Sequence, residues 1–66
     1  MHYQISKQVN RTTNGTTYAL FNVFASGKVA IGSYAKRADA KRAGEALLMK
    51  GDTLTTGKPE TYSLYA

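Results

Sequence analysis

The sequence TTYALFNVFASGKVAIGSYA, at residues 16–35, decides the fold expected for this chain. Two runs rich in β-branched and aromatic residues stand on either side of Ser26-Gly27, a pair that favours a tight turn. We therefore predict two antiparallel strands, at 16–25 and 28–35, joined at that turn. The first is expected to be the central strand of a small sheet and the second an outer strand.

The sequence before this stretch predicts a third strand, at 3–13. Its side chains alternate between apolar and polar, as they do in a half-buried strand. Asn14-Gly15 follows, and this pair is typical of a two-residue hairpin turn because both residues tolerate a positive φ. A two-residue turn places Val9 opposite Leu20 and, on the far side of the central strand, Val29 opposite Phe24.

Counting outward from the two turns assigns each strand residue to one of two faces of the sheet. The face expected to lie under a helix, named here the helix face, carries apolar side chains: Ile5, Val9, Leu20, Phe24, Val29 and Ile31. The opposite face, named the open face, carries mostly polar and aromatic side chains: Gln4, Ser6, Gln8, Asn10, Phe21, Val23, Lys28 and Tyr34. A turn one residue longer than assumed would exchange the two faces.

The sequence after the sheet predicts a helix at 37–50, packed on the helix face. Ala40, Ala43, Gly44 and Leu47 recur at helical spacing, and Gly51 is placed to end the helix. Small residues on this stripe would let the helix lie close to the sheet. Residues 52–60 are expected to form a loop, and residues 61–66 a short C-terminal strand at a sheet edge. The prediction is thus a single α+β domain over residues 1–66.

The composition indicates a small basic protein with an affinity for polyanions. Nine Lys and Arg residues face four acidic residues, which gives a net charge of +5 over 66 residues. Such a balance favours nucleic acid as a partner, although net charge also serves solubility. The chain has no cysteine, which excludes disulfides and thiolate metal sites. With no apolar run long enough for a membrane span and no signal-peptide core, a cytoplasmic protein without membrane contact is expected.

Few residues offer catalytic chemistry. The chain has a single histidine, His2, near the N-terminus. A serine or cysteine triad needs a histidine, so none is expected elsewhere in the chain. Asp39 and Glu45 are six residues apart, on different sides of the predicted helix. We therefore expect a protein that is not an enzyme and that uses neither a cofactor nor a metal ion.

The open face and the helix start are the candidate nucleic-acid-binding surfaces. Asn and Gln side chains hydrogen-bond adenine edges in the major groove, and exposed aromatic rings stack on unpaired bases. Cations at a helix start can share a phosphate with free backbone N–H groups. The candidate residues are Gln4, Ser6, Gln8, Asn10, Arg11, Phe21, Lys28, Tyr34, Lys36, Arg37, Lys41 and Arg42. A solvated polar face and a solvated charge run would give the same patterns.

The order of three strands and one helix resembles the arm-type DNA-binding domain of tyrosine integrases and the related plant ethylene-response-factor domain. The matching residues are Gly27-Lys28, Gly32-Ser33-Tyr34 and the alanines at positions 38, 40, 43 and 46. The resemblance covers roughly residues 3 to 50. It implies a sheet that enters the major groove of duplex DNA, with Lys28 and its outward neighbours in contact. The chain lacks the arginines and tryptophan usual on such sheets, and it adds a C-terminal strand.

Two functions therefore stand as expectations. The first is an accessory or regulatory protein that binds nucleic acid, with duplex DNA favoured. The second is a protein-binding module, such as a small phage or mobile-element inhibitor of a host protein, which would use Phe21, Val23 and Tyr34 or an edge strand. Homodimerisation through the same surface is compatible with either function.

Overall fold

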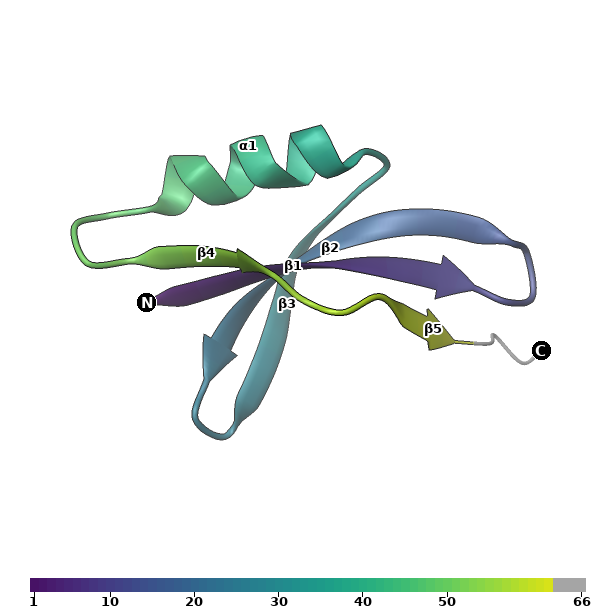
Figure 1. The fold of residues 1–66 in the computed structure, drawn as a ribbon, viewed down its shortest axis with the longest axis horizontal. Helices are drawn as coiled ribbons and strands as arrows, with labels where there is room; N and C mark the ends of the chain where they lie inside the picture. Colours follow the sequence, from purple (N-terminus) through teal and green to yellow (C-terminus); the bar gives the residue numbers. More distant parts are fainter. Residues whose placement is uncertain (63–66) are drawn as a thin grey trace.

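The computed structural model of the protein describes residues 1–62, which form one helix and one sheet (Figure 1). The elements follow in the order β1 (His2–Asn10), β2 (Gly15–Phe24), β3 (Gly27–Tyr34), α1 (Arg37–Leu47), β4 (Thr53–Thr56) and β5 (Glu60–Tyr62). The strand order is β3-β2-β1, and β4 and β5 both pair with the remaining edge of β1. The first three strands are antiparallel, whereas β4 and β5 run parallel to β1. The predicted α+β class is confirmed.

The loop of the hairpin between β1 and β2 is longer than predicted. Asn10 pairs with Gly15, so residues 11–14 form a four-residue loop, and Val9 lies opposite Thr16 instead of Leu20. The loop begins after Asn10 because the side-chain oxygen of Asn10 accepts a hydrogen bond from the Thr12 N–H at 2.9 Å. Asn14 completes the loop with a φ of 58°. The pairing moves by an even number of residues, so each side chain stays on its predicted face.

The hairpin between β2 and β3 departs from the prediction twice. Its turn is at Ala25 and Ser26, and Val29 lies opposite Asn22 instead of Phe24. A bulge then leaves Ile31 without a partner, because Phe21 pairs with Ala30 and Leu20 with Gly32. One extra residue reverses the side-chain alternation for the rest of the strand.

Tyr34 is therefore on the helix face, and its prediction for the open face is wrong. It pairs with Tyr18 and packs against the core, whereas Lys28, which precedes the bulge, remains on the open face. The protein-binding patch of Phe21, Val23 and Tyr34 expected from the sequence does not form, because Tyr34 lies on the opposite side of the sheet.

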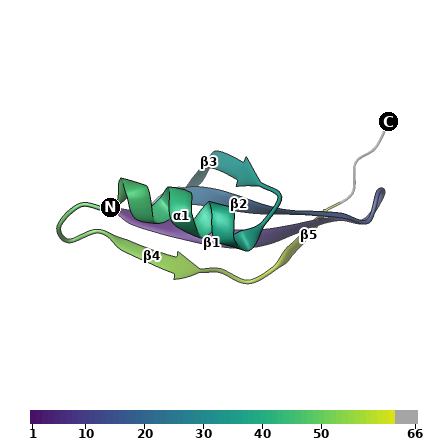
Figure 2. The same ribbon diagram turned by 90° about the horizontal axis from the view of Figure 1, so that it is seen from above.

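Helix α1 covers the helix face and contacts β1, β2 and β3 (Figures 1 and 2). The buried apolar core contains Tyr3, Ile5, Leu20 and Ala40. The predicted close approach is present at Gly44, where an added Cβ would lie 3.1 Å from both methyl carbons of Leu54.

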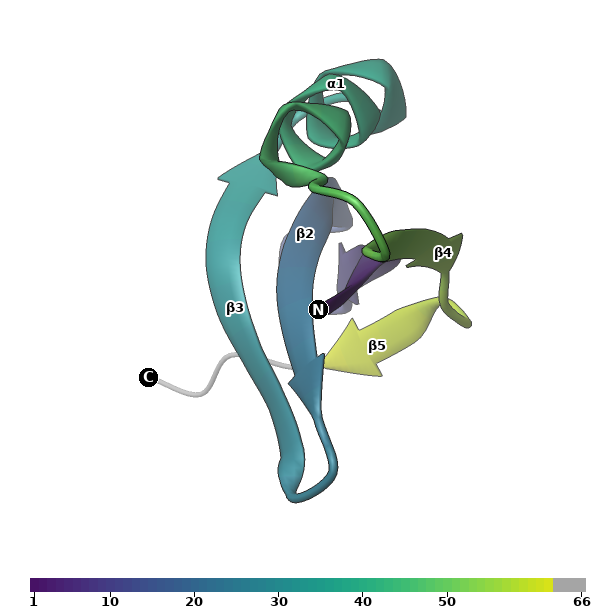
Figure 3. The same cartoon turned by 90° about the vertical axis from the view of Figure 1, so that its left-hand side faces the viewer.

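One residue of the predicted helix face is not covered by the helix. Phe24 was expected under α1, but its side chain is exposed, because the β2–β3 hairpin bends away from α1 (Figure 3).

The helix is shorter than predicted. It ends at Leu47, before the predicted Lys50, and Leu48 continues with extended backbone and packs against the core. The Asp52 carboxylate accepts a hydrogen bond from the Met49 N–H at 2.9 Å and turns the chain into β4.

Strand β4 occupies part of the segment predicted to be a loop. Its threonines suit a strand, and it pairs with β1 between His2 and Ile5. Leu54 packs on the core from this strand. Strand β5 lies at a sheet edge, as predicted for the C-terminal strand, and its description ends at Tyr62. The remainder of that predicted strand, residues 63–66, lies outside the described residues.

Candidate nucleic-acid interface

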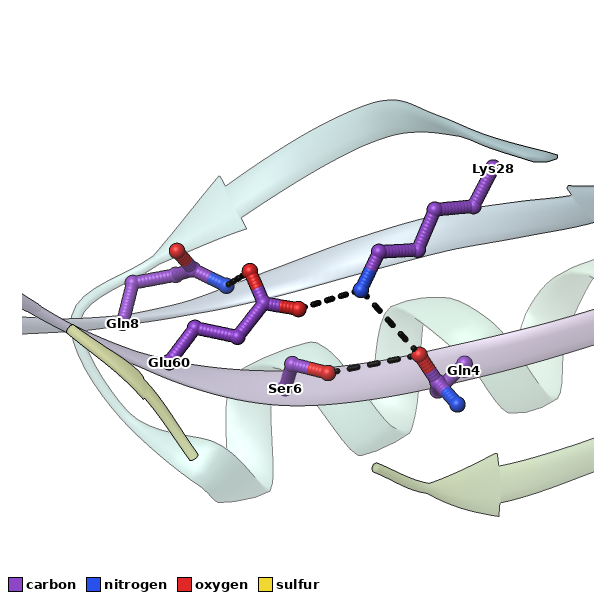
Figure 4. A network of polar contacts seen from close by, with 5 residues as sticks. All are labelled: Gln4, Ser6, Gln8, Lys28 and Glu60. Carbon is purple, nitrogen blue, oxygen red and sulfur yellow. Dashed lines mark hydrogen bonds and ion pairs between the residues drawn. The ribbon is translucent and has the colours of Figure 1, made fainter. Parts of the chain in front are cut away.

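The open face holds a network of polar side chains from β1, β3 and β5 (Figure 4). The Lys28 ammonium forms an ion pair with the Glu60 carboxylate and lies 3.5 Å from the side-chain oxygen of Gln4. The Gln8 amide donates to the other oxygen of Glu60 at 3.1 Å, and the Ser6 hydroxyl donates to Gln4 at 3.4 Å. Four predicted site residues therefore meet, but they bond to one another and to an acidic residue.

Glu60 is the member of this network that sequence reasoning missed. It lies in residues 52–60, which were predicted to form a loop, and the strand alternation that assigns a side chain to a face does not apply there. In the structure Glu60 pairs with Gln8 in register, which places its carboxylate on the open face. Hydrogen bonds from Lys28 and then Gln8 stabilise the carboxylate and lower the pKa of Glu60 below its usual value.

Two predicted contact residues of the open face are buried. Ser6 is 1% exposed and Asn10 is 6% exposed. Gly57 lies against Ser6, since an added Cβ at this glycine would be 2.6 Å from the Ser6 hydroxyl oxygen, and the Gly57 N–H donates to the Ile5 carbonyl at 2.8 Å. The segment between β4 and β5 thus covers Ser6, whereas the buried Asn10 side chain accepts a hydrogen bond from the Thr12 N–H, so neither residue is available to a partner.

Phe21, the predicted stacking residue, is half-buried and its ring already has a neighbour. The Lys28 ammonium lies 4.3 Å from the centre of the ring, which is a cation–π contact. Two side chains predicted to contact nucleic acid from the open face, Phe21 and Lys28, therefore contact each other.

The helix start and β1 carry a second group of cations, named here the basic cluster: Lys7, Lys36, Arg37 and Lys41. Two of them, Arg37 and Lys7, lie beside Tyr18. The Arg37 guanidinium is 5.5 Å from the centre of the Tyr18 ring, and Lys7 pairs with Tyr18 in register on the same face. Lys41 follows Arg37 by four residues, which places it one helical turn further along α1.

No member of the basic cluster forms an ion pair within residues 1–62, although Asp39 lies in the first turn of α1. The Lys and Arg side chains in ion pairs there are Lys28, with Glu60, and Arg42, whose guanidinium is 4.0 Å from Asp39. Asp52 pairs with the N-terminal ammonium. The predicted helix-start group is therefore divided, because Arg42 is in an ion pair while Lys36, Arg37 and Lys41 are not. Arg11 is exposed in the β1–β2 loop, where its backbone N–H donates to the Tyr62 carbonyl.

Comparison of the chain with protein-family models, curated proteins and solved structures found no match. The only helix within residues 1–62 is too short to cross a membrane. In the same part of the chain, no three His, Asp or Glu side chains gather where they could hold a metal ion.

Proposed function

We propose that this protein binds nucleic acid, with duplex DNA preferred, through the basic cluster at the start of α1. The observation that carries the proposal is the pair of cations beside Tyr18. Arg37 lies over the ring and Lys7 lies next to it on β1, and neither has an ion-pair partner among residues 1–62. Unpaired cations held together by the fold gain most from phosphates, because each contact releases condensed counterions.

The backbone of the helix start supports the same proposal. Lys36 is the N-cap residue, and no side chain caps the first N–H groups of α1. These groups and the helix dipole favour an anion, whereas Lys36 and Arg37 oppose the dipole. A phosphate placed there would accept hydrogen bonds from the backbone and offset the repulsion.

The shape of the sheet favours a duplex. The β1–β2 hairpin projects beyond the start of α1 (Figure 1), and β5 pairs with β1 along residues 8–10, so the loop at residues 11–14 is the part that extends past the third strand. The major groove of B-DNA, about 12 Å wide, admits two strands side by side, and we expect this end of the hairpin to approach it. Such an approach would bring Lys7 and Arg11 toward the phosphates that border the groove.

The open face has no part in this proposal. Gln4 and Gln8 were expected to hydrogen-bond base edges, but Gln8 donates to Glu60 and Gln4 accepts from Ser6 and Lys28. A base would have to replace these bonds and approach a carboxylate. We therefore assign phosphate contacts to the basic cluster and no base reading to the open face.

The deciding experiment is a salt titration of binding to a fluorescent duplex of arbitrary sequence, with a single strand of the same length in parallel. The logarithm of affinity should fall linearly with the logarithm of salt concentration, by about 0.9 per phosphate contact for the duplex and about 0.7 for the single strand. Arg37→Glu should abolish binding at moderate salt. If neither nucleic acid binds at low salt, the proposal is wrong.

A second candidate function, protein binding, is favoured by a different surface from the one that the sequence indicated. Phe24, Val29 and Ile31 are exposed on the β2–β3 hairpin, away from α1 (Figure 3). Exposed apolar side chains that gather on one element are typical of protein interfaces. This surface does not overlap the basic cluster, so the two functions are compatible.

A further inference from the structure

The outer edge of β3 is open. Within residues 1–62, Gly27–Tyr34 pairs with β2 on one side and with no strand on the other. Beside this edge, Phe24 is 48% exposed, Val29 is 55% exposed and Ile31 is 46% exposed. Phe24 and Val29 lie on the same face of the sheet, on diagonal positions of neighbouring strands. An eight-residue edge strand with exposed apolar side chains is a template for pairing with another strand.

The charge that would normally protect such an edge is neutralised. Lys28 is the only charged residue of β3, and edge lysines usually prevent strand pairing. Here its ammonium points inward over Phe21 and pairs with Glu60 (Figure 4). Two β3 edges can therefore approach each other without charge repulsion.

The bulge at Ile31 limits which part of the edge is regular. It lies between the pairs Phe21–Ala30 and Leu20–Gly32, so residues 27–30 keep an uninterrupted ladder with β2. Val29 is within this regular part, and Ile31 directly follows it.

We propose that β3 pairs antiparallel with β3 of a second copy of this chain, about a two-fold axis at Val29. Val29 then lies beside its own copy, Lys28 lies opposite Ala30, and Ile31 lies opposite Gly27. An antiparallel pair about a two-fold axis is complementary to itself and forms a closed dimer. With the axis perpendicular to the sheet, both helices lie on the same side of one continuous sheet.

The size of the core supports self-association. Four apolar side chains, from Tyr3, Ile5, Leu20 and Ala40, make up the buried core cluster within residues 1–62. A domain of this length buries about 60% of its unfolded surface and is often stabilised by a partner. Covering Val29 and Ile31 would remove further apolar surface from water.

Sedimentation and light scattering across micromolar to millimolar concentrations, without nucleic acid, test the dimer. Val29→Lys should weaken dimerisation by about tenfold or more, because the two substituted charges face each other across the two-fold axis. Ile31→Lys should weaken it as well, because a charge replaces an apolar side chain that the dimer covers. The control Ala46→Lys, on the exposed side of α1, should dimerise like the unchanged chain. A chain that stays monomeric, or lysine variants that fold and still dimerise, would overturn the proposal.

A cross-link identifies the interface even if the lysine variants fail to fold. The chain has no cysteine, so Val29→Cys introduces a single thiol. Mild oxidation should link most of the Val29→Cys chains into covalent dimers, because a disulfide needs Cα atoms within about 7 Å. The control Ala46→Cys should link much more slowly. Equal rates for the two variants would contradict pairing at β3, and would leave the proposed nucleic-acid binding by the basic cluster unaffected.

Discussion

Lys28 and Glu60, from strands at opposite edges of the sheet, form an ion pair over the open face (Figure 4). This contact connects β3 to β5 across β2 and β1. It withdraws Lys28 from the partners that the sequence indicated, and it removes the charge from the edge of β3. The ion pair therefore has two effects. It engages Lys28 on the open face, and it leaves the edge of β3 without a free charge that would oppose pairing with another strand.

The Lys28–Glu60 pair should make stability depend on pH. Because the pKa of Glu60 is lowered in the folded protein, the pair contributes its full stability above the ordinary pKa of glutamate. This contribution is lost as the pH falls through the lowered pKa. Glu60→Gln should reduce the free energy of unfolding at neutral pH by about 0.5 kcal/mol, a small value because both side chains are partly exposed to solvent. Urea unfolding at neutral and acid pH measures the difference, which should vanish in acid. Glu45→Gln is the control of equal charge, and a difference that persists in acid would contradict the assignment.

The basic cluster should contribute to nucleic-acid affinity through charge and position together. Arg37→Ala and Lys41→Ala should each weaken duplex binding for all sequences and reduce the salt slope by about 0.9. Lys50→Ala removes the same charge beyond the end of α1 and should have a smaller effect. Fluorescence anisotropy at several salt concentrations compares the three variants. Equal losses would show that net charge, and not the cluster, determines binding.

Gly57 should not accept a side chain. An added Cβ would lie 2.6 Å from both the Ser6 hydroxyl oxygen and the amide carbon of Gln4. Gly57→Ala should therefore lower the free energy of unfolding by about 1–3 kcal/mol, as overpacking does elsewhere. Denaturant unfolding measures this loss, and Thr56→Ala, at an exposed position, is the control. Adding Gln4→Ala should restore part of the loss, and an unchanged stability of Gly57→Ala would mean that the segment does not pack on Ser6.

Asn14 should tolerate glycine but not a β-branched residue. Its φ of 58° lies in the left-handed region, which costs most residues about 1–2 kcal/mol. Asn14→Gly should leave the stability nearly unchanged, whereas Asn14→Val should lower it by more than 1 kcal/mol, on the order of that cost. Thermal unfolding of the two variants tests the loop, and equal stabilities would indicate a different loop conformation.

Asn22 offers a stabilising substitution. Its side-chain oxygen is buried and has no hydrogen-bond partner among residues 1–62, while its register neighbours are Tyr3 and Val29. An unsatisfied buried acceptor costs about 1–3 kcal/mol. Asn22→Leu should raise the free energy of unfolding by about 1 kcal/mol, measured by denaturant titration. A loss of stability would show that this amide makes a contribution that its contacts do not reveal.

Much of the sheet could be predicted from the sequence because strand side chains alternate with a period of two. Both hairpin registers were wrong by an even number of residues, so Leu20 still lies under the helix while Phe21 and Lys28 still lie on the open face. The small residues at Ala40 and Gly44 likewise predicted a helix lying close to the sheet. These features depend on neighbours within one element, and they survive an error in the turns.

Tertiary structure decided the rest, because it depends on contacts between residues far apart in the chain. The bulge at Ile31 moved Tyr34 to the helix face, and pairing with β1 made a strand of residues predicted to be a loop. The ion pair on the open face joins Lys28 and Glu60, which are 32 positions apart in the sequence. No local pattern encodes such a pair, since its formation requires β5 to return to the edge of β1 and the sheet to bring both charges to one face.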